Sequence, residues 1–240
     1  MITNLSVADP RNWPPPWGTT TSANVKVKSY LCPSAPDRTL DYAPYWVSLG
    51  LPNRGPFIIG PTDYSAIRGM HGNFRTACSP ATPAPSDECG ALGGVPTGGK
   101  AQWTASGLTV RPTLVGITDG TSNTLAFAES AGRHQVYVNR APVSPNTPGT
   151  AGWALNGAYF DYNTAIRVRA YNGTTADSGC NGINVTNGGG AGAYQIYSFH
   201  SGGANTLRCD GSVSFLRDGV SGATLGALVS KAGGEVANDS

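Results

Sequence analysis

Charged side chains are scarce in this chain. Aspartate, glutamate, lysine and arginine make up 12% of its 240 residues, and the formal net charge is +2. The lysines and arginines are scattered along the sequence, whereas proteins that bind nucleic acid or an anionic membrane surface carry basic clusters. We therefore expect no nucleic-acid partner and no binding to a charged membrane surface.

Long apolar runs and metal-binding spacings are also missing. No stretch approaches the ~20 consecutive apolar residues of a transmembrane helix, so we expect no membrane span in this chain. Glutamate occurs only as Glu88, Glu129 and Glu235, which gives no sign of the paired carboxylates of a glycosidase or aspartic protease. No C-x2-C or histidine-rich spacing indicates structural zinc. These absences favour a protein without a cofactor and without enzymatic activity.

Residues that form turns are abundant instead. The chain has 33 glycines and 18 prolines, a composition common in secreted β-rich proteins and in subunits of extracellular fibres. Its length is sufficient to bury a full hydrophobic core. Five cysteines are compatible with an oxidising compartment. We therefore expect an extracellular or cell-surface location.

The clearest strand pattern lies near the C-terminus. Residues 194–200, 204–209 and 212–217 alternate apolar and polar side chains, and turn residues separate them. The second separator, Asp210-Gly211, is a strong hairpin signal. These segments predict a three-stranded meander.

The same pattern predicts which side chains share a face of the sheet. Leu207 and Cys209 should lie with Val213 and Phe215 on the packed face. Apolar residues then recur at helical spacing over 225–232, behind Ser221 as a candidate N-cap. The fold class expected is α+β: an antiparallel β-rich domain with long loops and a short C-terminal helix.

We expect one domain over residues 25–240, preceded by an extended arm over residues 1–24. Loop insertions near 73–108 and 141–192 are rich in proline, glycine or polar residues. The arm contains Trp13-Pro-Pro-Pro-Trp17, which favours a polyproline conformation. It is either a loose terminus or a segment whose Trp13 and Trp17 dock on a neighbouring subunit.

Cysteine pairing is open from sequence alone. Cys78 and Cys89 flank a proline-rich segment, so a local disulfide between them is one expectation. Cys32 and Cys209 lie in apolar surroundings and are expected to be either paired or buried free thiols.

Four segments together resemble a bacterial family of prepilin-type, pseudopilin-like proteins. His200 is followed after nine residues by Asp210-Gly211, which resembles the H-x9-D-G signature of that family. The other three segments occur in the family's order: Leu31-Cys32-Pro33-Ser34, residues 117–125 followed by Glu129, and residues 225–235.

The resemblance implies a pseudopilin-like domain and a structural role for its motif residues. These residues are Cys32, Asp119, Gly120, Asn123, His200, Asp210 and Gly211. Family members usually begin with a basic leader and an apolar anchor helix, whereas residues 1–24 contain no such run. We therefore expect a structural subunit of an extracellular bacterial fibre or pilus-like filament, built from copies of itself through contacts other than that helix.

Two motifs have alternative chemical interpretations. His200 and Asp210 resemble a catalytic His–Asp pair, but no nearby serine lies in a G-x-S-x-G turn, so we favour hairpin architecture. Asp119, Asn123 and Glu129 offer oxygen ligands for calcium, the only cofactor that the sequence suggests. A turn stabilised by the Asp119 side chain is the alternative that we favour.

The long loops also allow a different function, a secreted module that binds a carbohydrate or another solute. Four N-x-S/T sequons are possible sites of glycosylation, although several are expected by chance in such a chain. They lie at Asn4, Asn172, Asn184 and Asn238.

Overall fold

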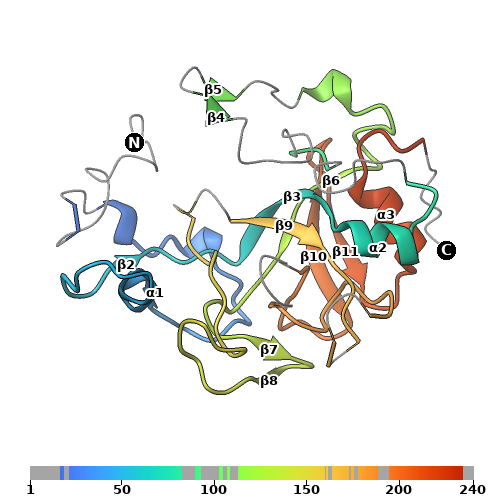
Figure 1. Ribbon diagram of the computed structural model, residues 1–240. Helices are drawn as coiled ribbons and strands as arrows, with labels where there is room; N and C mark the ends of the chain where they lie inside the picture. The colour runs from blue at the N-terminus through green and yellow to red at the C-terminus, as the bar shows by residue number, and fades with distance from the viewer. Residues whose placement is uncertain are drawn as a thin grey trace.

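A five-stranded sheet forms the centre of the molecule (Figure 1). The structure, a computed structural model, describes residues 17–18, 22–82, 90–92, 103–104, 107–108, 113–159, 161, 164–172, 174–175, 178–188 and 195–234. The strand order is β11-β10-β6-β3-β9, and all neighbouring pairs are antiparallel except β3 and β9. The strands are β3 (Tyr64–Met70), β6 (Leu125–Glu129), β9 (Ala165–Val168), β10 (Gly203–Arg208) and β11 (Val213–Arg217).

Two helices, α2 (Gly72–Cys78) and α3 (Gly222–Val229), lie side by side and cover one face of this sheet (Figure 1). Phe74 of α2 and Leu225 and Leu228 of α3 are buried against the sheet. The predicted cap is present, because Ser221 Oγ accepts a hydrogen bond from Thr224 N at 3.1 Å. The expected α+β class and short C-terminal helix are therefore confirmed.

A second apolar cluster lies around β1 (Leu40–Asp41), α1 (Ala43–Ser48) and β2 (Ile58–Ile59). Trp17 is buried in it, 5.7 Å between ring centroids from Phe57, and its Nε1 donates to Gly55 O at 3.0 Å. Trp17 is thus part of its own subunit's core, and its expected contact with a neighbour is wrong. Its large ring finds an apolar partner within the chain. Trp13 lies outside the described residues.

The remaining elements are short. They are the 3-10 turns η2 (Ser22–Asn24), η3 (Lys28–Tyr30) and η5 (Leu114–Gly116), and the pairs β4 (Trp103–Thr104) with β5 (Gly107–Leu108) and β7 (Tyr137–Val138) with β8 (Ala141–Pro142). Both expected loop regions contain regular structure, since α2 begins the first and β9 lies within the second. No helix among the described residues has the length and apolar character that crossing a bilayer requires.

The expected C-terminal meander has two strands rather than three. Residues 195–200 form only single bridges, Ile196 with Ile183 and Tyr197 with Ser130. The second neighbour of β10 is β6 instead. Ser198 interrupts further strand pairing. Its backbone N donates to the side-chain Oδ1 of Asn184, and its Oγ donates to Gly203 O.

The apolar face predicted for β10 and β11 is the outer face. Val213 is 72% exposed and Phe215 is 47% exposed, whereas Ala204 and Leu216 are buried under the helices. Alternation identified the residues that share a face. It did not identify which face the helices cover, because that depends on segments far away in sequence.

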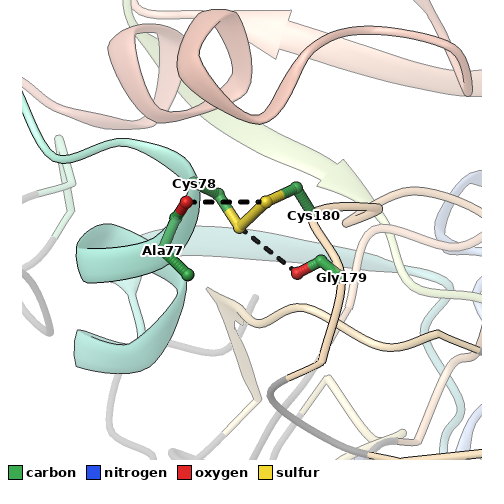
Figure 2. The surroundings of a disulfide bond; sticks show 4 residues. All are labelled: Ala77, Cys78, Gly179 and Cys180. Atoms are coloured by element: carbon green, nitrogen blue, oxygen red, sulfur yellow. Dashed lines mark hydrogen bonds between the residues drawn. A yellow bond between two sulfur atoms is a disulfide. The ribbon is translucent and has the colours of Figure 1, made fainter.

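The disulfide of the structure joins Cys78 to Cys180 across 102 residues, so the expected bond between Cys78 and Cys89 is wrong (Figure 2). Cys78 ends α2, and Cys180 lies in the loop after β9. Their Cα atoms are 5.4 Å apart, within the usual range for a disulfide. Proximity in sequence suggested the wrong partner, because α2 carries Cys78 toward the loop of Cys180. Cys32 and Cys209 are free thiols, the first buried and the second partly exposed.

His134 is buried among aromatic rings beside the second cluster. Its ring lies 4.6 Å from that of Tyr42 and stacks at 4.8 Å on Trp153, and Nδ1 donates to Ala154 O at 2.8 Å. Burial lowers the pKa of His134 from 6.5 to about 4. The folded chain therefore keeps this imidazole neutral at pH values where the unfolded chain protonates it.

We expect the free energy of unfolding to fall as the pH drops from about 6.5 to about 4. Protonation favours the unfolded chain throughout this window, and the total effect of His134 should be about 3 kcal/mol. Urea unfolding measured at several pH values tests this. A His134→Gln variant should lose this part of the pH dependence; an unchanged profile in the variant would contradict the assignment.

Candidate functional site

Three potential ligand side chains meet at one end of the sheet. Cys32 follows η3, Glu129 is the last residue of β6, and His200 lies in the loop before β10. His200 Nε2 is 3.4 Å from Cys32 Sγ and 3.2 Å from Glu129 Oε1. Cys32 and Glu129 are buried, and the His200 side chain is 26% exposed. We call these three residues the Cys–Glu–His cluster.

Each member of the cluster is held by a further contact. The backbone N of Cys32 donates to Asp63 Oδ2 at 2.9 Å, and Glu129 Oε2 accepts from Asn205 N at 2.6 Å. On the other side of the imidazole, His200 Nδ1 lies 3.3 Å from Ser34 Oγ. The cluster is therefore fixed by contacts with the N-terminal loop and with β10.

Asp63 is the main buried charge beside the cluster. Its side chain is fully buried and pairs with Arg38, with 2.5 Å between Oδ1 and the guanidinium. It also accepts backbone hydrogen bonds from Cys32 and Gly132. Asp63 thus ties the loop of Cys32 to the segment that follows β6.

Burial and nearby carboxylates keep the Cys32 thiol and the Tyr64 hydroxyl protonated. Burial raises the pKa of the Cys32 thiol to about 11, and the charges of Glu129 and Asp63 add to this effect. Burial and the charge of Glu129 raise the pKa of the neighbouring Tyr64 to about 12. At neutral pH, Cys32 is a thiol rather than a nucleophilic thiolate.

The arrangement does not place Cys32 in a nucleophile–base–acid relay, although Ser34 Oγ and Glu129 Oε1 face opposite nitrogens of His200, 3.3 Å from Nδ1 and 3.2 Å from Nε2. In such a relay the nucleophile and the acid contact opposite nitrogens of the imidazole. Here Cys32 and Glu129 both face Nε2 of His200. The three side chains converge on one point instead, which is the geometry of a site for a cation.

A groove lies on the outer face of the sheet. Its volume is about 630 Å³, and its lining includes Phe127, Leu207 and Val213. These residues pair across β6, β10 and β11 and so form one apolar row. Tyr30 and Tyr159, whose ring centroids lie 5.5 Å apart, also line the groove.

A comparison with known protein families identifies the family of this chain. The sequence model of the SBP_bac_10 family, described as a protein of unknown function (DUF1559), matches residues 3–221. The chain belongs to the DUF1559 family. No curated protein and no solved structure matches it. The DUF1559 match covers all three members of the Cys–Glu–His cluster and ends before α3.

In this DUF1559 protein, His200 and Asp210 lie at opposite ends of β10. That strand spans about 16 Å, so the two side chains are too far apart for a His–Asp pair. Asp210 accepts hydrogen bonds from the N and Oγ of Ser212, and these bonds lower its pKa. Gly211 follows with a φ of +89°, which glycine adopts without strain.

The three residues proposed for calcium are not brought together. Asp119 accepts from Gly233 N and Gly234 N after α3, and its own carbonyl accepts from Asn123 Nδ2. Glu129 lies at the far end of β6, a strand about 13 Å long. The Asp119-Gly120 turn, with a φ of +95° at Gly120, therefore anchors the end of α3 rather than a calcium site.

The described sequons differ in accessibility. Asn184 is buried, its side-chain Nδ2 donates to Gly203 O, and its Oδ1 accepts from Ser198 N. The folded chain therefore does not offer it as a glycan acceptor. Asn172 is exposed in a turn. Asn4 and Asn238 lie outside the described residues.

The sequence singled out Cys32 and His200 but did not connect them. It missed Asp63, Arg38 and Ser34 as supporting residues. The one available signal was that the motifs of Cys32, Glu129 and His200 belong to the same family. That signal does not show whether the three side chains are close in space.

Proposed function

We propose that this DUF1559 protein is a non-enzymatic structural subunit of an extracellular filament. Each copy would bind the N-terminal arm of the next copy in the groove on its outer sheet face. The observation that carries the proposal is the exposed apolar row of this face. The resemblance to prepilin-type proteins supports it.

The outer face of the sheet exposes large apolar side chains. Val213 and Phe215 of β11 are 72% and 47% exposed and Phe127 of β6 is 39% exposed, and β10 lies between these two strands. Contiguous apolar patches of this kind commonly mark binding surfaces in soluble proteins. A partner that covers this row would gain the hydrophobic free energy of burying it.

The arm has the chemistry to occupy the groove. Residues 11–16 read Arg-Asn-Trp-Pro-Pro-Pro, and proline-rich segments dock into grooves lined by aromatic residues. Tyr30, Tyr64 and Tyr159 line the groove, and Asp161 places a carboxylate there for a basic residue. Trp17 is fixed in its own core, and residues 1–16 span about 55 Å when fully extended, enough to reach a neighbouring copy. Such a head-to-tail contact generates an open polymer when its rotation does not close a ring.

Deleting residues 1–16 should leave a folded monomer that forms no filaments. Val213→Asp should have the same effect, because it places a charge in the apolar groove. Val115→Asp is the matched control, since Val115 is 91% exposed and is not part of the groove lining. Negative-stain images and light scattering measure assembly.

A mixture of the two assembly-deficient chains tests the direction of the contact. The deletion variant keeps a normal groove, and the Val213→Asp variant keeps a normal arm. Together they should form heterodimers that do not grow. Filaments made by the deletion variant alone would refute the proposal.

A solute-binding module is the second candidate, because the groove volume is within the range of small-molecule sites. A native chain that remains monomeric and binds glycans on an array would favour it. That binding should disappear in Val213→Asp.

A further inference from the structure

The two distances from His200 Nε2 within the Cys–Glu–His cluster are close to those between the ligands of a tetrahedral metal ion. The three ligand atoms all lie within 4.8 Å of one another. At Zn–N and Zn–O distances of about 2.0 Å and a Zn–S distance of about 2.3 Å, neighbouring ligand atoms are about 3.3–3.6 Å apart. The observed separations from His200 Nε2 are 3.4 Å to Sγ and 3.2 Å to Oε1. Little movement would be needed to enclose an ion.

The hydrogen bonds of the cluster leave one buried acceptor unsatisfied. Glu129 is fully buried, and among the described residues its Oε1 has no hydrogen bond of normal geometry. His200 Nε2 lies 3.2 Å from Oε1, but this contact is not well aligned, and a buried carboxylate oxygen without a well-aligned donor is costly. A single proton on Nε2 can be directed at Oε1 or at Sγ, but not well at both. A cation at the centre would contact all three atoms.

Contacts behind the three ligand atoms suit a bound metal. With Nε2 on the metal, Nδ1 carries the proton and can donate to Ser34 Oγ, 3.3 Å away. Glu129 Oε2 already accepts from Asn205 N, which directs Oε1 toward His200. These are the outer contacts that orient metal ligands in proteins.

We propose that Cys32, Glu129 and His200 bind one zinc ion, and that the Cys32 thiol releases its proton to water as its sulfur binds the metal. One sulfur, one imidazole nitrogen and one carboxylate oxygen suit zinc, whereas calcium and magnesium prefer oxygen ligands alone. Three protein ligands leave a fourth position beside the partly exposed His200, for water or for an incoming ligand. The ion would join the N-terminal loop, the end of β6 and the loop before β10. This inference does not depend on filament formation.

Equilibrium dialysis of the full chain against zinc sulfate, followed by elemental analysis, tests the site. We expect one zinc per chain, with at least about tenfold weaker binding in Cys32→Ser and Glu129→Gln. Cys209→Ser is the matched control, because Cys209 is the other free thiol among the described residues, and it should bind zinc normally. Ser34→Ala should weaken binding while leaving all three ligands in place.

Cobalt provides a readout that identifies the sulfur. Co²⁺ added to the native chain and to Cys209→Ser should produce a thiolate-to-cobalt absorption band, and Cys32→Ser should lack it. Circular dichroism of each variant separates loss of the site from loss of the fold. Absence of stoichiometric zinc binding in the folded native chain would overturn the proposal, as would normal binding in folded Cys32→Ser.

Discussion

Replacing Asp63 with alanine should lower the free energy of unfolding by about 3–5 kcal/mol, the range for breaking a buried ion pair. Asp63 is fully buried and its partner Arg38 is 13% exposed. The variant would leave the Arg38 guanidinium without its carboxylate in a poorly hydrated position. Among the described residues, Arg38 would keep its carbonyl partners, Arg133 O and Thr62 O.

The loss extends beyond the ion pair, because Asp63 also accepts hydrogen bonds from the backbone. The N–H groups of Cys32 and Gly132 each donate to it at 2.9 Å. Both donors would be left without this acceptor, and unsatisfied buried donors are costly. A double variant, Arg38→Met with Asp63→Leu, should therefore recover only part of the lost stability.

Urea unfolding of the native chain and the variants measures these differences. Asp37→Asn is the matched control, because Asp37 forms an ion pair with Lys26 at 2.7 Å but is exposed. Surface pairs contribute little, so this control should keep the native midpoint. Equal midpoints for Asp63→Ala and Asp37→Asn would contradict the structural role of Asp63.

Local features of the fold were predictable because short segments determine them. The Ser221 cap and the Asp210-Gly211 turn depend on residues that are neighbours in sequence. The position of β9 was not predictable in the same way. It is four residues long, lies among loops and pairs in parallel with β3, almost 100 residues earlier in the chain. Nothing within residues 165–168 specifies that partner.

The candidate site illustrates a second limit. Spacing rules detect metal ligands that are close in sequence, and they indicated no zinc site here. Cys32, Glu129 and His200 come from three distant segments and meet only through the sheet order. Their convergence is therefore a property of the fold, although each residue lies in a recognisable motif.

The second large effect concerns the disulfide between Cys78 and Cys180. Removing it in a Cys78→Ala, Cys180→Ala double variant should lower the free energy of unfolding by about 2–4 kcal/mol, because the bond closes a loop of about 100 residues. It also fixes the end of α2 beneath α3. A Cβ at Gly222 would lie 2.8 Å from that of Cys78, so the two helices approach closely there.

Thermal and urea unfolding with and without a reductant test the disulfide. Reduction should destabilise the native chain and leave the double variant unchanged. Cys89→Ser distinguishes the two possible partners of Cys78. It should behave like the native chain if Cys78 pairs with Cys180, since the long loop then stays closed. If Cys89→Ser lost as much stability as the double variant, Cys78 would pair with Cys89 instead, and the connection between α2 and the loop after β9 would be wrong.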